Sequence, residues 1–84
     1  MKPESLSNRI RKYVRRQYPA VVNGGELERL AFENGFKASN ASRRARELEN
    51  DGILKVSYTE KGSAEYQYIP SEHELIKINI TGSL

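Results

Sequence analysis

Apolar residues in the first part of the chain recur at the spacing of one helix face. Five residues make up this stripe: Leu6, Ile10, Tyr13, Val14 and Tyr18. Because side chains three or four positions apart lie on the same side of a helix, the stripe predicts an amphipathic helix over residues 5–18. Pro19 ends that helix, since proline lacks an N–H and restricts the residue before it.

A short strand and a second helix are predicted next. Residues 21–23 (Val-Val-Asn) form a β-prone run that two glycines stop. Residues 26–34 then show helical spacing, with acids in the first turn, where the helix dipole favours them. The buried side of this helix is the set Leu27, Leu30 and Ala31. Gly35 suits a left-handed cap at its C-terminal end.

A third helix is predicted over residues 40–50, with Ser39 as its N-cap and Gly52 just beyond its end. Its buried side is small and consists of Ala41, Ala45 and Leu48. Such a narrow apolar face allows close packing against the preceding helix. Because only about four residues separate the two helices, the pair is typical of a helix-turn-helix.

After Gly52 the hydrophobic period changes from helical to two. Residues 54–58 and 64–68 alternate apolar and polar side chains, and the loop between them contains Gly62. This pattern predicts a β-hairpin, which Pro70 ends. Three tyrosines fall on its apolar side: Tyr58, Tyr66 and Tyr68. We expect them to face the core, and stacking on single-stranded bases is the alternative.

The tail at residues 71–84 gives two conflicting signals. Residues 71–74 are typical of a turn or a helix start, whereas Ile76, Ile78 and Ile80 alternate like a strand. The tail is therefore left open between an extra strand and a disordered segment. A strand could pair with the sheet edge of another chain, so a second copy of this chain or another protein is its candidate partner.

Length and composition bound the class of protein. The 84 residues fit one small α+β domain, which we place at residues 1–70, with 71–84 as a tail. The absence of cysteine excludes disulfides, zinc–cysteine sites and thiol nucleophiles. No apolar run approaches the ~18–20 residues of a membrane span, and no signal-peptide pattern opens the chain, so we expect a soluble cytoplasmic protein.

Nothing in the sequence resembles a catalytic site. The single histidine, His73, has no partners at metal-ligand or catalytic spacing. The glycines at positions 24 and 25 lack the Lys-Ser/Thr that would follow in a phosphate-binding loop. We therefore expect no enzyme, no bound metal and no cofactor.

Positive charge is clustered on two segments. The formal net charge is +3 and the pI is near 9.3. Residues 1–18 hold six Lys or Arg against one Glu, and residues 37–50 hold four against two. A basic domain with clustered arginine fits a polyanionic partner.

On a helical wheel, the side of residues 40–50 opposite Ala41 and Ala45 is polar and basic. This side presents Ser39, Arg43, Arg46 and Asn50, with Arg44 at its border. A helix fits the ~12 Å major groove of DNA, where Arg can pair with guanine, and Asn or Ser can contact bases or phosphates. The alternative for such a face is an ordinary solvated surface.

Two stretches of the chain resemble the winged helix-turn-helix superfamily. Residues 25–31 (Gly-Glu-Leu-Glu-Arg-Leu-Ala) are similar to its second helix, and residues 39–54 (Ser-Asn-Ala-Ser-Arg-Arg-Ala-Arg-Glu-Leu-Glu-Asn-Asp-Gly-Ile-Leu) to its recognition helix and exit to the wing. The similarity covers roughly residues 5–70. It implies three helices, a short strand at Val21-Val22 that pairs with a C-terminal hairpin, and a wing tip at residues 59–64.

The resemblance implies double-stranded DNA as ligand and a role as a small transcriptional regulator, associated with the nucleoid. The expected DNA-binding residues are Ser39, Asn40, Ser42, Arg43, Arg44, Arg46, Asn50, Lys37, Lys61, Arg15, Arg16 and Lys12. The wing departs from a basic pattern, since Lys61 stands beside Glu60 and near Glu65. Some winged helices bind only proteins, so an adaptor within a larger complex is the alternative function.

Overall fold

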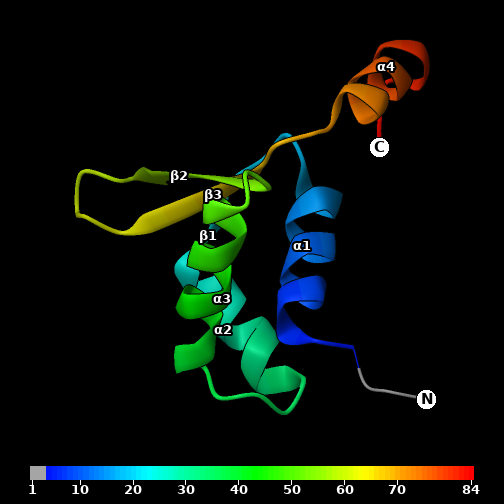
Figure 1. Cartoon of the computed structure of the whole chain (residues 1–84). Coiled ribbons are helices and arrows are strands. Elements are labelled where there is room, and N and C mark those ends of the chain that lie inside the picture. The colour runs from blue at the N-terminus through cyan, green and yellow to red at the C-terminus, as the bar shows by residue number, and fades with distance from the viewer. Residues whose placement is uncertain (1–3) are drawn as a thin grey trace.

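The computed structural model describes residues 4–84, which form a small α+β fold with four helices and a three-stranded antiparallel sheet (Figure 1). The elements in chain order are α1 (Leu6–Gln17), β1 (Val22–Asn23), α2 (Gly24–Glu33), α3 (Ser39–Asn50), β2 (Leu54–Tyr58), β3 (Ala64–Tyr68) and α4 (Glu72–Thr81). The first three helices and the strands lie where the sequence predicts them, within a few residues, and α4 is an additional helix.

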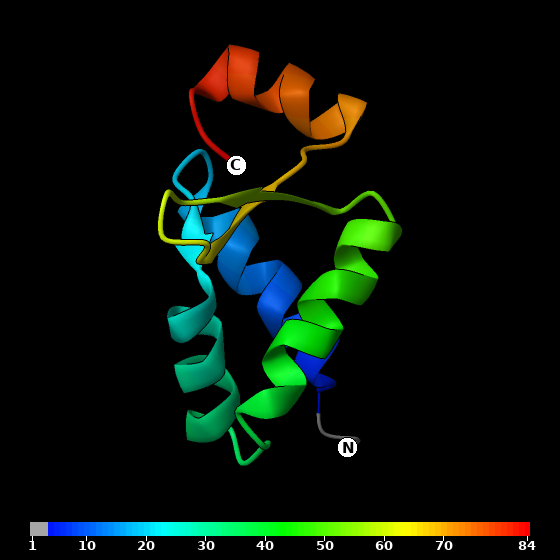
Figure 2. The ribbon, with the colours of Figure 1, turned by 90° about the vertical axis from the view of Figure 1, so that its left-hand side faces the viewer.

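Helices α1, α2 and α3 group together on one side of the sheet. Figures 1 and 2 show that the β2–β3 hairpin projects beyond these helices, while α4 stands on the opposite side of the sheet. The sheet order is β1-β3-β2, with both neighbouring pairs antiparallel. The short strand predicted near Val22 therefore pairs with the hairpin, as expected, with Val22 opposite Tyr66.

Side-chain caps start two of these helices. The Ser5 hydroxyl accepts from the backbone N–H of Asn8 at 3.2 Å, which starts α1. The Asn23 side chain accepts from the backbone N–H of Glu26 at 2.8 Å, so α2 begins at Gly24, two residues earlier than the apolar pattern predicts.

The prediction that Ser39 caps the third helix is wrong. Ser39 is the first helical residue, and the N-cap is Ala38, whose backbone is already helical and whose side chain makes no cap bond. The turn is wound from Lys37 onward, because the Asn40 N–H bonds to the Lys37 carbonyl at 3.0 Å. The Ser39 side chain is consequently left exposed rather than used as a cap.

Glycines close both α2 and α3 as predicted. Gly35 and Gly52 have φ values of 82° and 78°, which favour glycine because a Cβ is strained there. The residue after each glycine bonds back across the last turn: Phe36 to the Ala31 carbonyl at 2.9 Å and Ile53 to the Leu48 carbonyl at 2.9 Å. These paired bonds satisfy the last carbonyl groups of each helix and turn the chain sharply.

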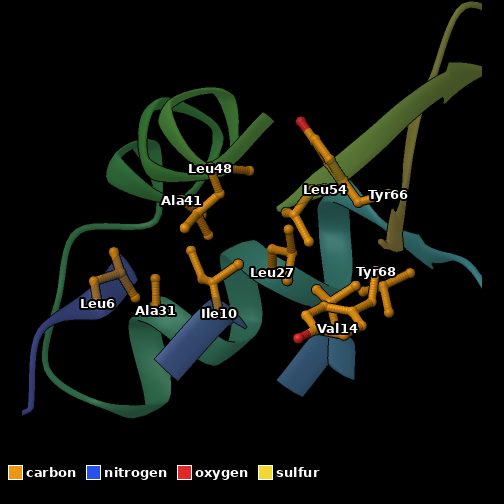
Figure 3. Close-up of a cluster of buried hydrophobic side chains, with 12 residues drawn as sticks. Leu6, Ile10, Val14, Leu27, Ala31, Ala41, Leu48, Leu54, Tyr66 and Tyr68 are labelled. Carbon is orange, nitrogen blue, oxygen red and sulfur yellow. The ribbon is translucent and has the colours of Figure 1, made fainter. Parts of the chain in front are cut away.

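One core joins the three helices to the sheet (Figure 3). Its buried side chains are Leu6, Ile10, Val14, Val22, Leu27, Ala31, Ala41, Ala45, Leu48, Leu54, Tyr66 and Tyr68. Alanines 41 and 45 on α3 are fully buried, which lets α3 lie close to α1 and α2. The helical stripes of the sequence therefore identify the buried faces of α1, α2 and α3.

The expectation that all three hairpin tyrosines face the core is wrong for one of them. Tyr66 and Tyr68 are buried, but Tyr58 is 70% exposed. Tyr58 has the right alternation for the inner face, yet it lies at the end of β2, where the core no longer covers that face. Alternation predicts which face of a strand a residue occupies, and the extent of the core decides whether that face is covered.

The tail forms a helix, so the strand interpretation of Ile76, Ile78 and Ile80 is wrong. Ser71 and Glu74 make a reciprocal capping box at the start of α4, and Gly82, with φ 82°, ends it. No residue of α4 is buried. Within residues 4–84, no helix combines the length and the apolar character that crossing a membrane would need.

Candidate nucleic-acid interface

The outer side of α3 gathers five of the predicted site residues. A shallow hollow of ≈ 350 Å³ is lined by Ser39, Ser42, Arg43, Arg46, Glu47 and Asn50. All five predicted residues in this set are exposed, opposite the buried Ala41 and Ala45. The structure therefore places hydroxyl, guanidinium and amide groups on one open face, with Glu47 as an acidic neighbour that the prediction did not include.

The arginines of α3 differ in their partners. Arg44 is half-buried and bonds to both carboxylate oxygens of Glu47, at 2.9 and 3.1 Å. Within the part of the chain that the structure describes, Arg43 and Arg46 make neither a hydrogen bond nor an ion pair with another side chain. Their guanidinium donors face solvent and are available to an external acceptor.

The remaining predicted residues near α3 occupy its edges. Asn40 is half-buried in the first turn, and Lys37 is exposed in the turn between α2 and α3. Lys61 lies in the loop of the hairpin and is also exposed. Neither Lys37 nor Lys61 lines the α3 hollow, and Lys61 instead lines the hollow beneath the hairpin.

A larger hollow of ≈ 810 Å³ lies beneath the hairpin and beside the start of α2. It is lined by Asn23, Gly24, Gly25, Glu28, Ser42, Thr59, Glu60, Lys61, Ser63, Ala64, Glu65 and Tyr66. Ser42 lines this hollow as well as the one on α3, so the two adjoin. The prediction missed this hollow, because its acids, Glu28, Glu60 and Glu65, come from distant parts of the sequence.

The predicted cations of α1 lie elsewhere. Lys12, Arg15 and Arg16 line a third hollow with Tyr18, Ser83 and Leu84, which shares no residue with the α3 hollow. Arg15 is paired with Glu74 at 2.6 Å and Lys12 with Glu4 at 2.9 Å. The structure does not bring these three cations to the outer side of α3, and two of them already neutralise a carboxylate.

Glu74 is the centre of a polar cluster that the sequence prediction missed, and the cluster includes a residue from the distant α1. Its carboxylate accepts from the Arg15 guanidinium, from the Tyr68 hydroxyl at 2.7 Å and from the Ser71 backbone N–H at 3.0 Å. Burial raises the pKa of Glu74, but these hydrogen bonds outweigh it and lower the pKa to about 2. The same contact raises the pKa of Arg15. Arg15 and Glu74 are 59 residues apart in sequence, so no local pattern joins these two residues.

Among residues 4–84, no group of three or more His, Asp or Glu side chains is placed to hold a metal ion. His73 is exposed on α4. Comparison with known proteins adds no assignment: no family model, no curated protein and no solved structure matches the chain.

Proposed function

We propose that this protein binds double-stranded DNA through the outer side of α3, as a winged helix-turn-helix domain. The observation that carries the proposal is that Arg43 and Arg46 lie on one exposed helix face with Ser39 and Asn50, and that neither guanidinium has a partner among residues 4–84. Arginine donors in a fork match the acceptors of guanine, and amide and hydroxyl groups match bases or phosphates. A role as a small transcriptional regulator follows if the binding is sequence-specific.

The packing of α3 supports its insertion into a groove. Ala41 and Ala45 are fully buried, so α3 lies close to α1 and α2 on one side while its opposite side stays free. A helix exposed in this way can enter the ~12 Å major groove of B-DNA. The hairpin, which leaves the end of α3 and carries its loop across to the start of α2, takes the place of a wing against the adjacent backbone (Figure 2).

The test is fluorescence anisotropy of the full chain against a random-sequence duplex over a salt series. We expect near-micromolar binding at low salt that weakens steeply as salt rises, because phosphate contacts release counterions. On a random-sequence duplex, where neither arginine has a preferred base and both contact phosphates, the Arg43→Ala/Arg46→Ala variant should lower the slope of log affinity against log salt by ~2. Arg29→Ala is the matched control, since Arg29 is exposed on α2, away from the α3 hollow. If the parent does not bind the duplex at low salt, the proposal is wrong.

A protein-interaction domain is the second candidate, and α4 is the observation that favours it. Leu75, Ile76 and Ile80 are large apolar side chains that α4 leaves exposed, Ile80 to 78%. A helix of 10 residues that buries none of them gains little from its own packing. The partner that can be tested directly is a second copy of the chain, which would bury these side chains against their equivalents.

Sedimentation velocity over a range of protein concentrations tests this candidate. A dimer that forms with rising concentration in the parent, and is lost in Ile76→Asp/Ile80→Asp, would support self-association through α4. The control is Asn79→Asp, which adds a carboxylate at an exposed position of α4 outside the hollow that Ile76 and Ile80 line. A parent that stays monomeric throughout would rule out the second copy as partner.

A further inference from the structure

Two tyrosines of the hairpin mark the point where the core ends beside α3. In the β2–β3 pair, Val56 faces Tyr66 and Tyr58 faces Ala64, so all four side chains share the inner face of the sheet. Tyr66 is 6% exposed, whereas Tyr58, one step nearer the loop on that face, is 70% exposed. Tyr58 therefore extends the line of core residues out into solvent.

The hydroxyl groups of both tyrosines are free. Among the described residues neither hydroxyl has a hydrogen-bond partner, whereas those of Tyr13 and Tyr68 both donate to carboxylates. The Tyr66 ring is packed in the core, but its hydroxyl oxygen is not fully buried and keeps contact with solvent. Figure 3 shows that oxygen at the edge of the core cluster, on the side of α3.

Two charged residues of α3, Arg46 and Glu49, affect the pKa of the Tyr66 hydroxyl. Burial raises the pKa of Tyr66, the nearby Tyr58 raises it further, Arg46 lowers it and Glu49 raises it. The two adjoining hollows give the geometric link, because Ser42 lines one of them with Tyr66 and the other with Arg46, which follows Ser42 by one turn of α3. Arg46, Tyr58 and Tyr66 therefore border the inner corner where α3 meets the hairpin, and Glu49 lies one turn after Arg46 on the same helix.

We infer that Arg46, Tyr58 and Tyr66 hold one backbone phosphate of duplex DNA in this corner. The inference rests on the proposed function and divides the two free arginines of α3 by role. Arg46 becomes a phosphate ligand that positions the duplex, and Arg43 is left to contact base edges. The hairpin and α3 then form one continuous surface rather than two separate contacts.

Physical chemistry favours a phosphate over other ligands here. The corner offers one cationic donor and two hydroxyl groups that can donate, which suits an anionic oxygen, and Glu49 is the carboxylate beside it. Tyr66 is fixed by the core, so little side-chain freedom is lost when its hydroxyl binds. Glu49 opposes the phosphate by charge repulsion. Neutralising Glu49 should therefore strengthen DNA binding. No such gain is expected if Glu49 lies on a solvated surface away from the DNA.

The experiment measures duplex affinity by anisotropy for the parent, Tyr58→Phe, Tyr58→Leu and Glu49→Gln, with melting curves to verify folding. The duplexes are one random sequence and one selected sequence. Tyr18→Phe and Glu33→Gln are the matched controls, because Tyr18 lies in the hollow of α1 and Glu33 is exposed on α2. Each control makes the same chemical change away from the corner.

We expect Tyr58→Phe to weaken binding to both duplexes by the same ~3–10-fold, the value of an ordinary hydrogen bond, because the exposed Tyr58 hydroxyl exchanges a bond to water for one to the phosphate. Glu49→Gln should tighten both by ~2–5-fold at low salt, and the gain should shrink as salt rises. The ratio of affinities for the selected and random duplexes should stay constant in both variants, since phosphate contacts carry no sequence information.

Three results would overturn the inference. If the parent binds and both Tyr58→Phe and Glu49→Gln match it, the corner is outside the interface while the proposed function stands. If Tyr58→Phe matches the parent but Tyr58→Leu is weak, the ring stacks and the hydroxyl holds no phosphate. If Tyr58→Phe weakens only the selected duplex, the tyrosine contacts a base. A parent that binds neither duplex removes the proposed function as well.

Discussion

Arg43 and Arg44 are neighbours on α3, yet only Arg43 has its guanidinium free. Arg44 is held by both oxygens of Glu47, three residues further along the helix. An external phosphate or base would have to replace that bidentate contact, whereas Arg43 has nothing to give up. The two residues carry the same charge in the sequence, and they differ only in the contacts that their side chains make in the structure.

Replacing Arg43 by Ala should cost ~1–3 kcal/mol of binding to a selected duplex and reduce discrimination at one base pair. Arg44→Ala should cost less, because its guanidinium is already neutralised by Glu47. Anisotropy against the selected duplex and against single-base variants of it measures both effects. Equal losses for the two variants would show that the Arg44–Glu47 pair opens on binding, and an unchanged Arg43→Ala would remove Arg43 from the interface.

At the scale of elements, α3 depends on two alanines. Ala41 and Ala45 are both 0% exposed, and α3 packs against α1 as well as α2. Small side chains at these positions set how closely the three helices approach. The same closeness leaves no room for a longer or charged side chain.

Ala45→Arg should therefore unfold the protein or lower its melting temperature strongly, because the change buries an unpaired charge in a filled core. The matched control is Ser42→Arg, which adds the same side chain at an exposed position of the same helix. Thermal melting followed by circular dichroism compares the two. A folded Ala45→Arg protein with parental melting would mean that α3 is rotated relative to the buried face described above.

Local signals account for the parts of the fold that the sequence predicted. The stripes of α1, α2 and α3 repeat within a few turns, and Gly35 and Gly52 are required by positive φ at the helix ends. The hairpin loop is similar, with Gly62 at φ 84°. In each case the physical cause lies within a few residues of the pattern.

The failures have two kinds of cause, which are other local signals that outweigh the pattern and the packing of the chain in three dimensions. The isoleucines of α4 alternate as in a strand, but a capping box and Gly82 fix a helix there. Ser39 could have capped α3, and the chain instead starts the helix one residue earlier. The exposure of Tyr58 depends on where the helices stop beneath the hairpin, and the acids beneath the hairpin meet only in three dimensions.

The same distinction applies to the candidate site. The wheel of residues 40–50 predicts the exposed face of α3, since helix geometry alone fixes it. Charge clustering also suggested the cations of α1, but two of these pair with Glu4 and Glu74 and lie in a separate hollow. A count of charges cannot show which carboxylate each one meets.

At the scale of the whole molecule, Glu74 ties the last helix to the first. Its contacts with Arg15 and Tyr68 join α4 to α1 and β3, although α4 buries no apolar residue of its own. The position of α4 over the sheet thus depends on charge more than on packing. Conditions that change the charge of Glu74 should release α4.

The pH dependence of stability tests this link. Because the pKa of Glu74 falls from 4.5 to about 2 on folding, the folded protein binds its proton less tightly than the unfolded chain. The contribution of Glu74 is therefore fully present above pH 4.5 and is lost as the pH falls from 4.5 towards 2. At neutral pH we expect Glu74→Gln to be about 1–2 kcal/mol less stable than the parent, after allowance for solvent screening.

Urea unfolding across this pH range gives the difference between the parent and Glu74→Gln at each pH. Glu72→Gln is the control, because Glu72 is exposed in the same helical turn and joins no ion pair among residues 4–84. The Glu74→Gln difference should shrink towards zero as the pH approaches 2, while the control stays near the parent throughout. A Glu74→Gln difference that is constant with pH would mean that Glu74 acts through shape, and its charge would not be what holds α4 in place.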